Sequence, residues 1–243
     1  MEESPVKPLL LWLLDLRRYL LRILLILLIL SLFFLWVAPR VLIWLQAHFG
    51  QKLAFFGVAE PWLALLKVAF LSAFVVCFPY LLWLIWRAMA RVFGLGKLSG
   101  FLTLLIGTML FYGGMLFCFF ITLPYGMKFL LSFQRKEIVP TISVGHFVNF
   151  VALFLLAFGL IFELPLFMIL LAWVGVLDPY KAVRYRRHAI LIITILAAVI
   201  TPTPDVFNLS LMAVPLYLLF EAGLLGARLA VRRRSKLLRG NAG

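Results

Sequence analysis

The sequence is poor in the residues that soluble enzymes use for chemistry. Its 243 residues include only nine acids, three histidines and two cysteines. His48, His146 and His188 are scattered, and both cysteines lie in apolar runs, so we expect neither a histidine metal site nor a disulfide framework. The motifs H-E-x-x-H, G-x-S-x-G and G-x-G-x-x-G do not occur. These absences predict a protein that is not an enzyme and binds no cofactor.

Charge is scarce and mostly of one sign. Only 13% of the residues are charged, 65% are hydrophobic, the mean hydropathy is +1.13, and the formal net charge is +14. A soluble domain cannot cover so much apolar surface, whereas lipid can surround it. The basic residues stand at the ends of apolar runs, which is typical of membrane topology and not of nucleic-acid binding. We therefore predict an all-α integral membrane protein.

Six apolar runs are long enough to be membrane spans. Counting the basic residues with the N-terminus inside gives seventeen on the cytoplasmic side and six outside, so we expect both termini inside. The prediction is one six-helix transmembrane domain over 1–230 and a basic cytoplasmic tail over 231–243. The expected spans are 19–38, 62–86, 101–123, 147–175, 189–201 and 206–227.

The expected spans differ in length. The fourth has about 29 residues and would exceed 40 Å at ~1.5 Å per residue, more than the ~30 Å hydrocarbon core. It must tilt, bend or protrude. The fifth has about 13 residues, or roughly 20 Å at the same rise. We expect short fifth and sixth helices and a locally thin membrane beside them.

The fourth span carries one acid, Glu163, near its middle. An ionised carboxylate facing lipid is costly, so the side chain should face protein or a wet cavity. Pro165 removes a backbone donor and bends the helix, and Gly159, one turn earlier, would leave room beside the acid. Two interpretations stay open at this point: a polar notch that binds a partner, or a carboxylate that only bonds a neighbouring helix.

The remaining acids lie near the ends of spans. Glu60 and Pro61 begin the second span and would set its entry angle through capping and a fixed φ. Asp205, in "TPTPDVFN", suits a rigid turn and an N-cap. Glu221 favours an ion pair with Arg228, seven residues on, or interfacial packing. We group Glu60, Pro61, Asp205 and Glu221 with Glu163 and Pro165 as candidate contacts for partner helices or a cavity.

Several stretches, in order along residues 9 to 225, resemble one family. They include "LLDLRRYLLR", "EPWLALLKVAF", "FGLIFELP", "TPTPDVF" and "YLLFEAG". The chain resembles TatC, the multi-spanning subunit of the twin-arginine protein translocase. The resemblance implies a curved, glove-like bundle of six helices in a bacterial or archaeal cytoplasmic membrane, with Glu163 on the concave face. It also implies TatA- and TatB-like single-span partners in a homo- or hetero-oligomer, twin-arginine precursor proteins as cargo, and the proton gradient as driving force.

The same resemblance implies that twin arginines are read by two cytoplasmic carboxylates, since guanidinium groups favour bidentate acceptors. Asp15 matches the first, and we predict that it and Arg17 contact the signal peptide. The second acid is missing: Arg91 and Lys97 stand where the family has proline and glutamate. Three explanations remain open, namely recognition by Asp15 alone, another acid in its place, or a diverged paralogue.

An alternative function from the residues alone is a small-solute or proton transporter that uses Glu163. Such a protein would need further acids or histidines at membrane depth to relay protons, and the sequence offers few.

Overall fold

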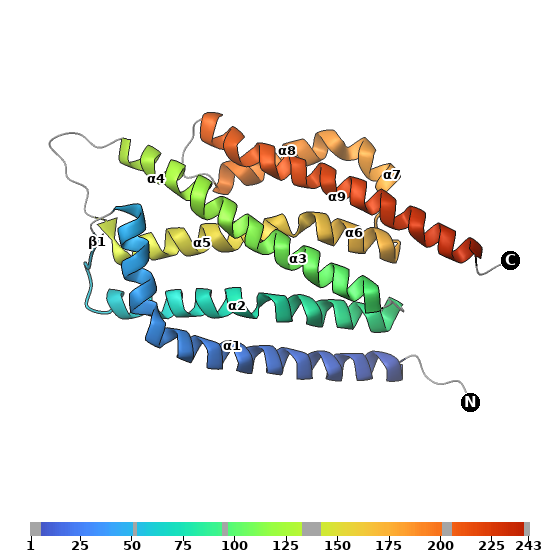
Figure 1. Cartoon of the computed structure of the whole chain (residues 1–243), viewed down its shortest axis with the longest axis horizontal. Helices are drawn as coiled ribbons and strands as arrows, with labels where there is room; N and C mark the ends of the chain where they lie inside the picture. Colours follow the sequence, from blue (N-terminus) through green and yellow to red (C-terminus); the bar gives the residue numbers. More distant parts are fainter. Residues whose placement is uncertain (1–5, 51–52, 94–96, 133–141, 201–205, 241–243) are drawn as a thin grey trace. The chain divides into compact units, whose positions relative to one another are not determined.

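The computed structural model describes residues 6–50, 53–93, 97–132, 142–200 and 206–240, and these are mostly helical (Figure 1). Two short strands interrupt the helices. In chain order the elements are α1 (Val6–Phe49), β1 (Leu53–Ala54), α2 (Glu60–Phe93), α3 (Lys97–Phe117), a π-helical turn η1 (Cys118–Thr122), α4 (Leu123–Ser132), β2 (Ile142–Ser143), α5 (Val144–Phe162), α6 (Leu164–Val174), α7 (Pro179–Ala182), a 3₁₀ turn η2 (Val183–Tyr185), α8 (Arg186–Ile200) and α9 (Val206–Gly240).

Five helical segments in the described residues are long and apolar enough to cross a membrane. The expected fifth span corresponds to α8, which has 15 residues, or about 22 Å at ~1.5 Å per residue. It is therefore short, as the sequence predicted. The five candidate spans are Leu21–Phe49, Glu60–Arg87, Gly100–Lys128, Val144–Val174 and Met212–Arg232.

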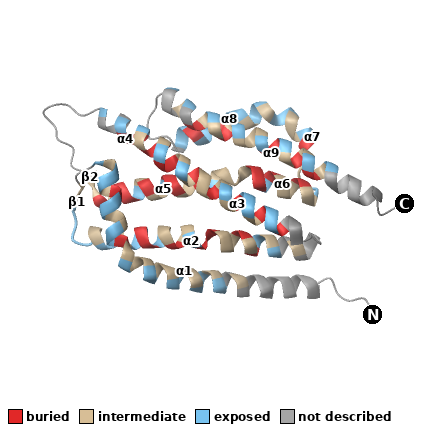
Figure 2. Cartoon of the chain, in the orientation of Figure 1, coloured by how far each residue is buried: buried red, intermediate tan, exposed pale blue. Residues whose placement is uncertain are grey.

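By their internal contacts the residues form two compact units, and the first comprises residues 1–95 and 141–152. Within it α1 and α2 lie side by side (Figure 1). The buried residues of α2 include Ala64, Ala69, Ala73 and Cys77, and such small side chains allow close approach between membrane helices. Most of the described part of α1 is half-buried or exposed (Figure 2).

A small parallel sheet joins two distant parts of the first unit. Leu53 of β1 pairs with Ile142 of β2, and Ala54 pairs with Ser143. The sheet therefore brings the segment before α2 next to the start of α5.

The second unit comprises residues 96–140 and 153–243. Here α9 packs against α6 and α8, and the buried residues of these three helices include Met168, Ile193, Leu216 and Leu224. α3 contacts the second half of α5 at glycine positions, where an added Cβ would collide with the neighbouring helix. This unit holds Glu163.

Several helices are longer than the expected spans, and α1 and α9 exceed them most. α1 continues through Pro39 to Phe49 instead of ending at residue 38. The guanidinium of Arg40 lies 5.0 Å from the ring centroid of Trp36, one turn earlier, and Leu45 is buried beyond the proline, so side-chain contacts support the helix on both sides. α9 has 35 residues, and the expectation of a short sixth helix is wrong. Its last turns are rich in Leu, Arg and Lys, which are good helix formers.

Candidate functional site

The fourth apolar run is interrupted at Glu163, between α5 and α6. The Glu163 N–H donates to the carbonyl of Leu160 at 3.2 Å, and its carbonyl accepts from the N–H of Phe167 at 2.9 Å. Pro165, the second residue of α6, is buried and has no N–H to continue the ladder. The sequence therefore places the single acid of this run at a break in the helix.

The Glu163 side chain is half-buried. Its Oε1 atom is buried and has no hydrogen-bond partner among the residues that the structure describes. Buried polar atoms in proteins nearly always have a partner. Among the described residues this oxygen is therefore an unsatisfied polar atom at the break.

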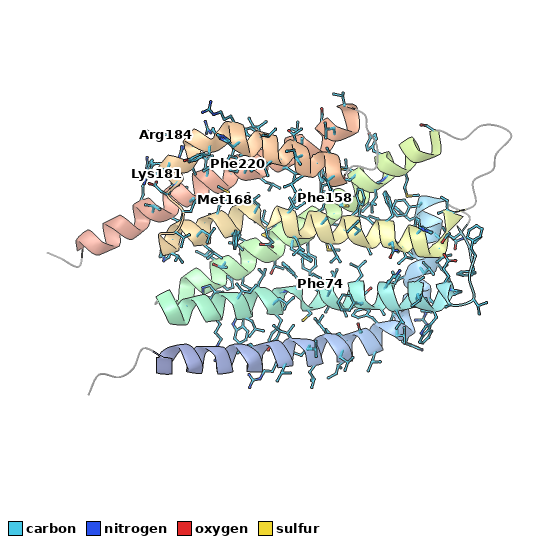
Figure 3. All side chains as sticks on the ribbon, turned by 180° about the vertical axis from the view of Figure 1, so that it is seen from behind. Phe74, Phe158, Met168, Lys181, Arg184 and Phe220 are labelled. Atoms are coloured by element: carbon cyan, nitrogen blue, oxygen red, sulfur yellow. The ribbon has the colours of Figure 1, made fainter. Side chains whose placement is uncertain are left out.

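Aromatic rings pack on the α5 side of the break. Phe117 lies 6.0 Å from Phe158 and 5.7 Å from Phe162, measured between ring centroids. Figure 3 marks Phe158 on α5 and Met168 on α6, on either side of the break. The expectation that Gly159 leaves room beside Glu163 is wrong, because a Cβ there would lie 2.7 Å from the Phe111 ring. The glycine allows α3 to approach α5 closely.

On the other side of the break, glycines fix α6 against α9. A Cβ on Gly223 would lie 3.0 Å from the Cα of Pro165 and 2.8 Å from the sulfur of Met168. A Cβ on Gly226 would lie 2.5 Å from Ile169. These contacts leave little freedom for α6 to move along α9.

Glu221 forms a polar cluster between α8 and α9. Its Oε2 accepts from Nη2 of Arg186 at 2.7 Å, and its Oε1 accepts from the hydroxyl of Tyr217 at 2.8 Å. The predicted pairing with Arg228 is wrong, and Nε of Arg228 is buried without a partner in the described part of the chain. Seven residues span two helical turns, about 10.5 Å, whereas the fold brings Arg186 into direct contact.

Glu60, the first residue of α2, accepts four hydrogen bonds. The donors are the N–H groups of Phe56 at 2.7 Å and Gly57 at 3.3 Å, the Ser143 hydroxyl, and the Gly145 N–H at 2.8 Å. Pro61 follows as the second residue of α2. Glu60 thus links the start of α2 to the start of α5. The sequence had suggested only a cap for α2 itself.

The predicted site residues do not form one cluster. Glu163 and Pro165 are together at the helix break, whereas Glu60 with Pro61, and Glu221, belong to separate groups. The side chains of Asp15 and Arg17, and all of Asp205, lie outside the described residues. Sequence reasoning missed Arg186, Tyr217 and Ser143. Only Tyr217 had a local signal, its spacing of four residues from Glu221 on one helix.

Comparison with known proteins decides the family. The model of the Sec-independent protein translocase protein (TatC) family matches residues 12–215. The chain belongs to the TatC family. It is 34% identical over 179 residues to the TatC protein of Carboxydothermus hydrogenoformans, covering 73% of this chain and 74% of that one. It is 32% identical over 196 residues to TatC of Aquifex aeolicus, covering 79% and 81%.

Solved TatC structures share the fold. A crystal structure of the twin-arginine translocase receptor TatC matches with a TM-score of 0.76 and 31% identity, covering 90% of this chain and 99% of that one. A second crystal structure of the receptor, in the detergent DDM, matches with the same TM-score and 30% identity, covering 88% and 98%. This TatC-family chain is therefore a membrane component of Sec-independent protein translocation, as its sequence indicated.

Proposed function

We propose that this protein receives twin-arginine signal peptides and, with TatA- and TatB-like single-span partners, exports folded proteins across the cytoplasmic membrane using the proton gradient. The observation that carries the proposal is the buried, unpartnered Oε1 of Glu163 at a helix break within a candidate span. Family membership and the similarity to a solved twin-arginine translocase receptor support it. The protein acts by binding and positioning other chains, without enzyme chemistry.

The proposed topology has six spans in one domain, with both termini in the cytoplasm and the basic residues after 230 on that side. α8 is the fifth span in chain order, and its short length thins the bilayer beside it. The excess of basic residues in the segments assigned to the cytoplasm supports this orientation. A curved bundle with Glu163 on its concave side follows from the resemblance to TatC.

Glu163 is the proposed contact for a partner helix. Its buried oxygen accepts a hydrogen bond from a polar side chain of a single-span subunit, and Pro165 holds the helix break open for that subunit. Glu60, Pro61, Asp205 and Glu221 remain proposed contacts for partner helices or a cavity.

Crosslinking tests this role. A photoreactive side chain at position 163 should crosslink to co-expressed TatA- or TatB-like subunits. The matched control is position 167, where Phe167 is exposed one turn later and should crosslink mainly to lipid. In a separate copurification experiment without the photoreactive side chain, Glu163→Gln should retain the single-span subunits better than Glu163→Leu, since only glutamine retains an acceptor oxygen. Crosslinks from position 163 to lipid alone would contradict the proposal.

Asp15 is the proposed acceptor for the twin arginines, with Arg17 beside it on the peptide-binding segment. The first cytoplasmic connection contains Arg91 and Lys97 and lacks an acid, so Asp15 carries more of the recognition here than its counterpart in relatives with two acids.

Peptide affinity tests this role. Asp15→Ala should weaken binding of a twin-arginine peptide by about tenfold or more, the equivalent of losing one charge-assisted hydrogen bond. Asp15→Glu should retain most of the affinity, and a peptide with two glutamines in place of the arginines is the specificity control. Equal affinity of the wild type and Asp15→Ala would exclude Asp15 as the acceptor.

A further inference from the structure

The turn before α2 exposes an unusual set of apolar side chains. Every residue from Phe55 to Ala59 is exposed, including Phe56 at 69% and Val58 at 103% of full exposure. The segment Leu53–Ala59, here called the apolar turn, contains no charged or polar side chain. Exposed apolar surface of this kind marks a contact with a membrane or with another protein.

The apolar turn is held in this exposed form by hydrogen bonds. The Glu60 carboxylate accepts the N–H groups of Phe56 and Gly57 from the turn itself and two further donors, the Ser143 hydroxyl and the Gly145 N–H. A Cβ on Gly145 would lie 2.9 Å from Oε1 of Glu60. The Glu60 carboxylate can therefore come this close to the start of α5 only because residue 145 is a glycine. The turn therefore presents its side chains outward from a fixed backbone.

The position of the apolar turn brings it to a membrane surface. The second candidate span begins at Glu60, so the turn lies where α2 leaves the bilayer, whichever side that is. The last part of α1, which leads into the turn, runs at a steep angle to the first part of α1 (Figure 1). The exposed side chains of the turn continue along α2 into Trp62, Leu63, Leu66 and Phe70, which are also exposed. The last three recur at helical spacing on one face of a candidate span, where the surrounding medium is lipid. Lys67 is exposed on the same face, two turns from the start of α2, and its long side chain can reach the headgroups from there.

We propose that the apolar turn inserts into the boundary between lipid headgroups and acyl chains, and that Glu60 holds it there. Phenylalanine and tryptophan side chains suit this zone. The continuity with the lipid-facing residues of α2 favours lipid over a protein as the occupant. The charge of Glu60 is tolerated beside the turn because four donors satisfy its oxygens. This inference does not depend on signal-peptide recognition.

Site-directed spin labelling in liposomes of phosphatidylethanolamine and phosphatidylglycerol tests the insertion. The full chain carries Cys77→Ala and Cys118→Ala, and a nitroxide is attached at Val58→Cys. Two collision rates of the nitroxide are measured, one with oxygen, which concentrates in acyl chains, and one with a nickel chelate, which stays in water. The first rate divided by the second is the oxygen-to-nickel ratio. The matched control is Arg184→Cys, an exposed residue of η2 (Figure 3).

We expect the oxygen-to-nickel ratio at position 58 to exceed the ratio at position 184 several-fold. Equal ratios at the two positions would place the turn in water and overturn the proposal. Low collision rates with both reagents at position 58 would show that a protein surface covers the turn, and would overturn it too.

A second pair of variants tests Glu60. Glu60→Gln replaces one acceptor oxygen by an amide donor, so either the Phe56 and Gly57 N–H groups or the Ser143 and Gly145 groups lose their acceptor. The electron paramagnetic resonance spectrum of the label at position 58 should then be narrower, because the turn moves more freely, and the oxygen-to-nickel ratio should be lower. Ser143→Ala, which removes one donor and leaves the carboxylate in place, should have the same effect to a smaller degree. A ratio unchanged in both variants would overturn the assignment of Glu60.

Discussion

Gly114 of α3 is the position where one added methyl group should be most damaging. A Cβ there would lie 2.6 Å from the carbonyl oxygen of Phe158 and 2.7 Å from the Phe162 ring. The oxygen belongs to the backbone of α5 and cannot rotate away. The contact is roughly 0.8 Å short of the 3.4 Å at which ordinary contact begins, so Gly114→Ala requires α3 and α5 to separate.

The neighbouring glycine provides the control. A Cβ on Gly113 would meet nothing within 4 Å, and alanine is preferred to glycine inside a helix by up to about 1 kcal/mol. Overpacking of a close contact typically costs about 1–3 kcal/mol. Gly114→Ala should therefore be less stable than Gly113→Ala, which should be unchanged or slightly stabilised. The gain in helix preference applies equally to both variants, so the difference between these two identical chemical changes is the overpacking cost at Gly114 alone, about 1–3 kcal/mol.

Thermal unfolding in detergent, followed by tryptophan fluorescence, measures this difference. For a chain of this length it corresponds to a separation of midpoints of roughly 2–12 °C. A larger residue at position 114, as in Gly114→Val, should lower the midpoint further. The packing argument would be refuted by equal midpoints for Gly113→Ala and Gly114→Ala.

Two further changes follow from the second unit. Arg186→Gln should lower the free energy of unfolding by about 1 kcal/mol through loss of the contact with Glu221, and a double-mutant cycle with Glu221→Gln measures the coupling. Lys181→Gln is the control and should have almost no effect, because the Lys181–Asp178 pair, at 3.8 Å, is highly exposed. Gly175→Ala should cost about 1 kcal/mol, because Gly175 ends α6 with φ of 93°, a left-handed conformation that favours glycine, and Gly175→Asn should restore part of the loss in the same unfolding assay.

The sequence was sufficient to predict the class of protein and the helix break. Long apolar runs and the placement of basic residues determine that the chain is a helical membrane protein, because the bilayer leaves few other ways to satisfy the backbone. Pro165 marks the interruption of the fourth run because it lacks a backbone donor, a property of the residue itself. The short α8 follows in the same way from the number of apolar residues available.

Contacts between distant residues were not predictable from local patterns. Glu221 was assigned to Arg228 because both lie on one helix, yet its partner Arg186 comes from α8, and only packing of α8 on α9 brings them together. Gly159 was interpreted as a gap because the sequence does not show that Phe111 fills the space beside it. The four donors of Glu60 likewise come from two segments separated by about 85 residues.

The hydrogen bonds made by Glu60 tie the first turn of α2 to the first turn of α5. The first residue of α2 binds the second residue of α5 directly, so the heights at which these helices enter the bilayer are coupled. A single-residue insertion just after Glu60 would rotate the rest of α2 by about 100° relative to this anchor and change the face that it presents along its whole length, whereas an insertion just before Glu60 would disturb its bonds to Phe56 and Gly57. Natural length variation in this chain should therefore avoid residues 56–61 and 142–145.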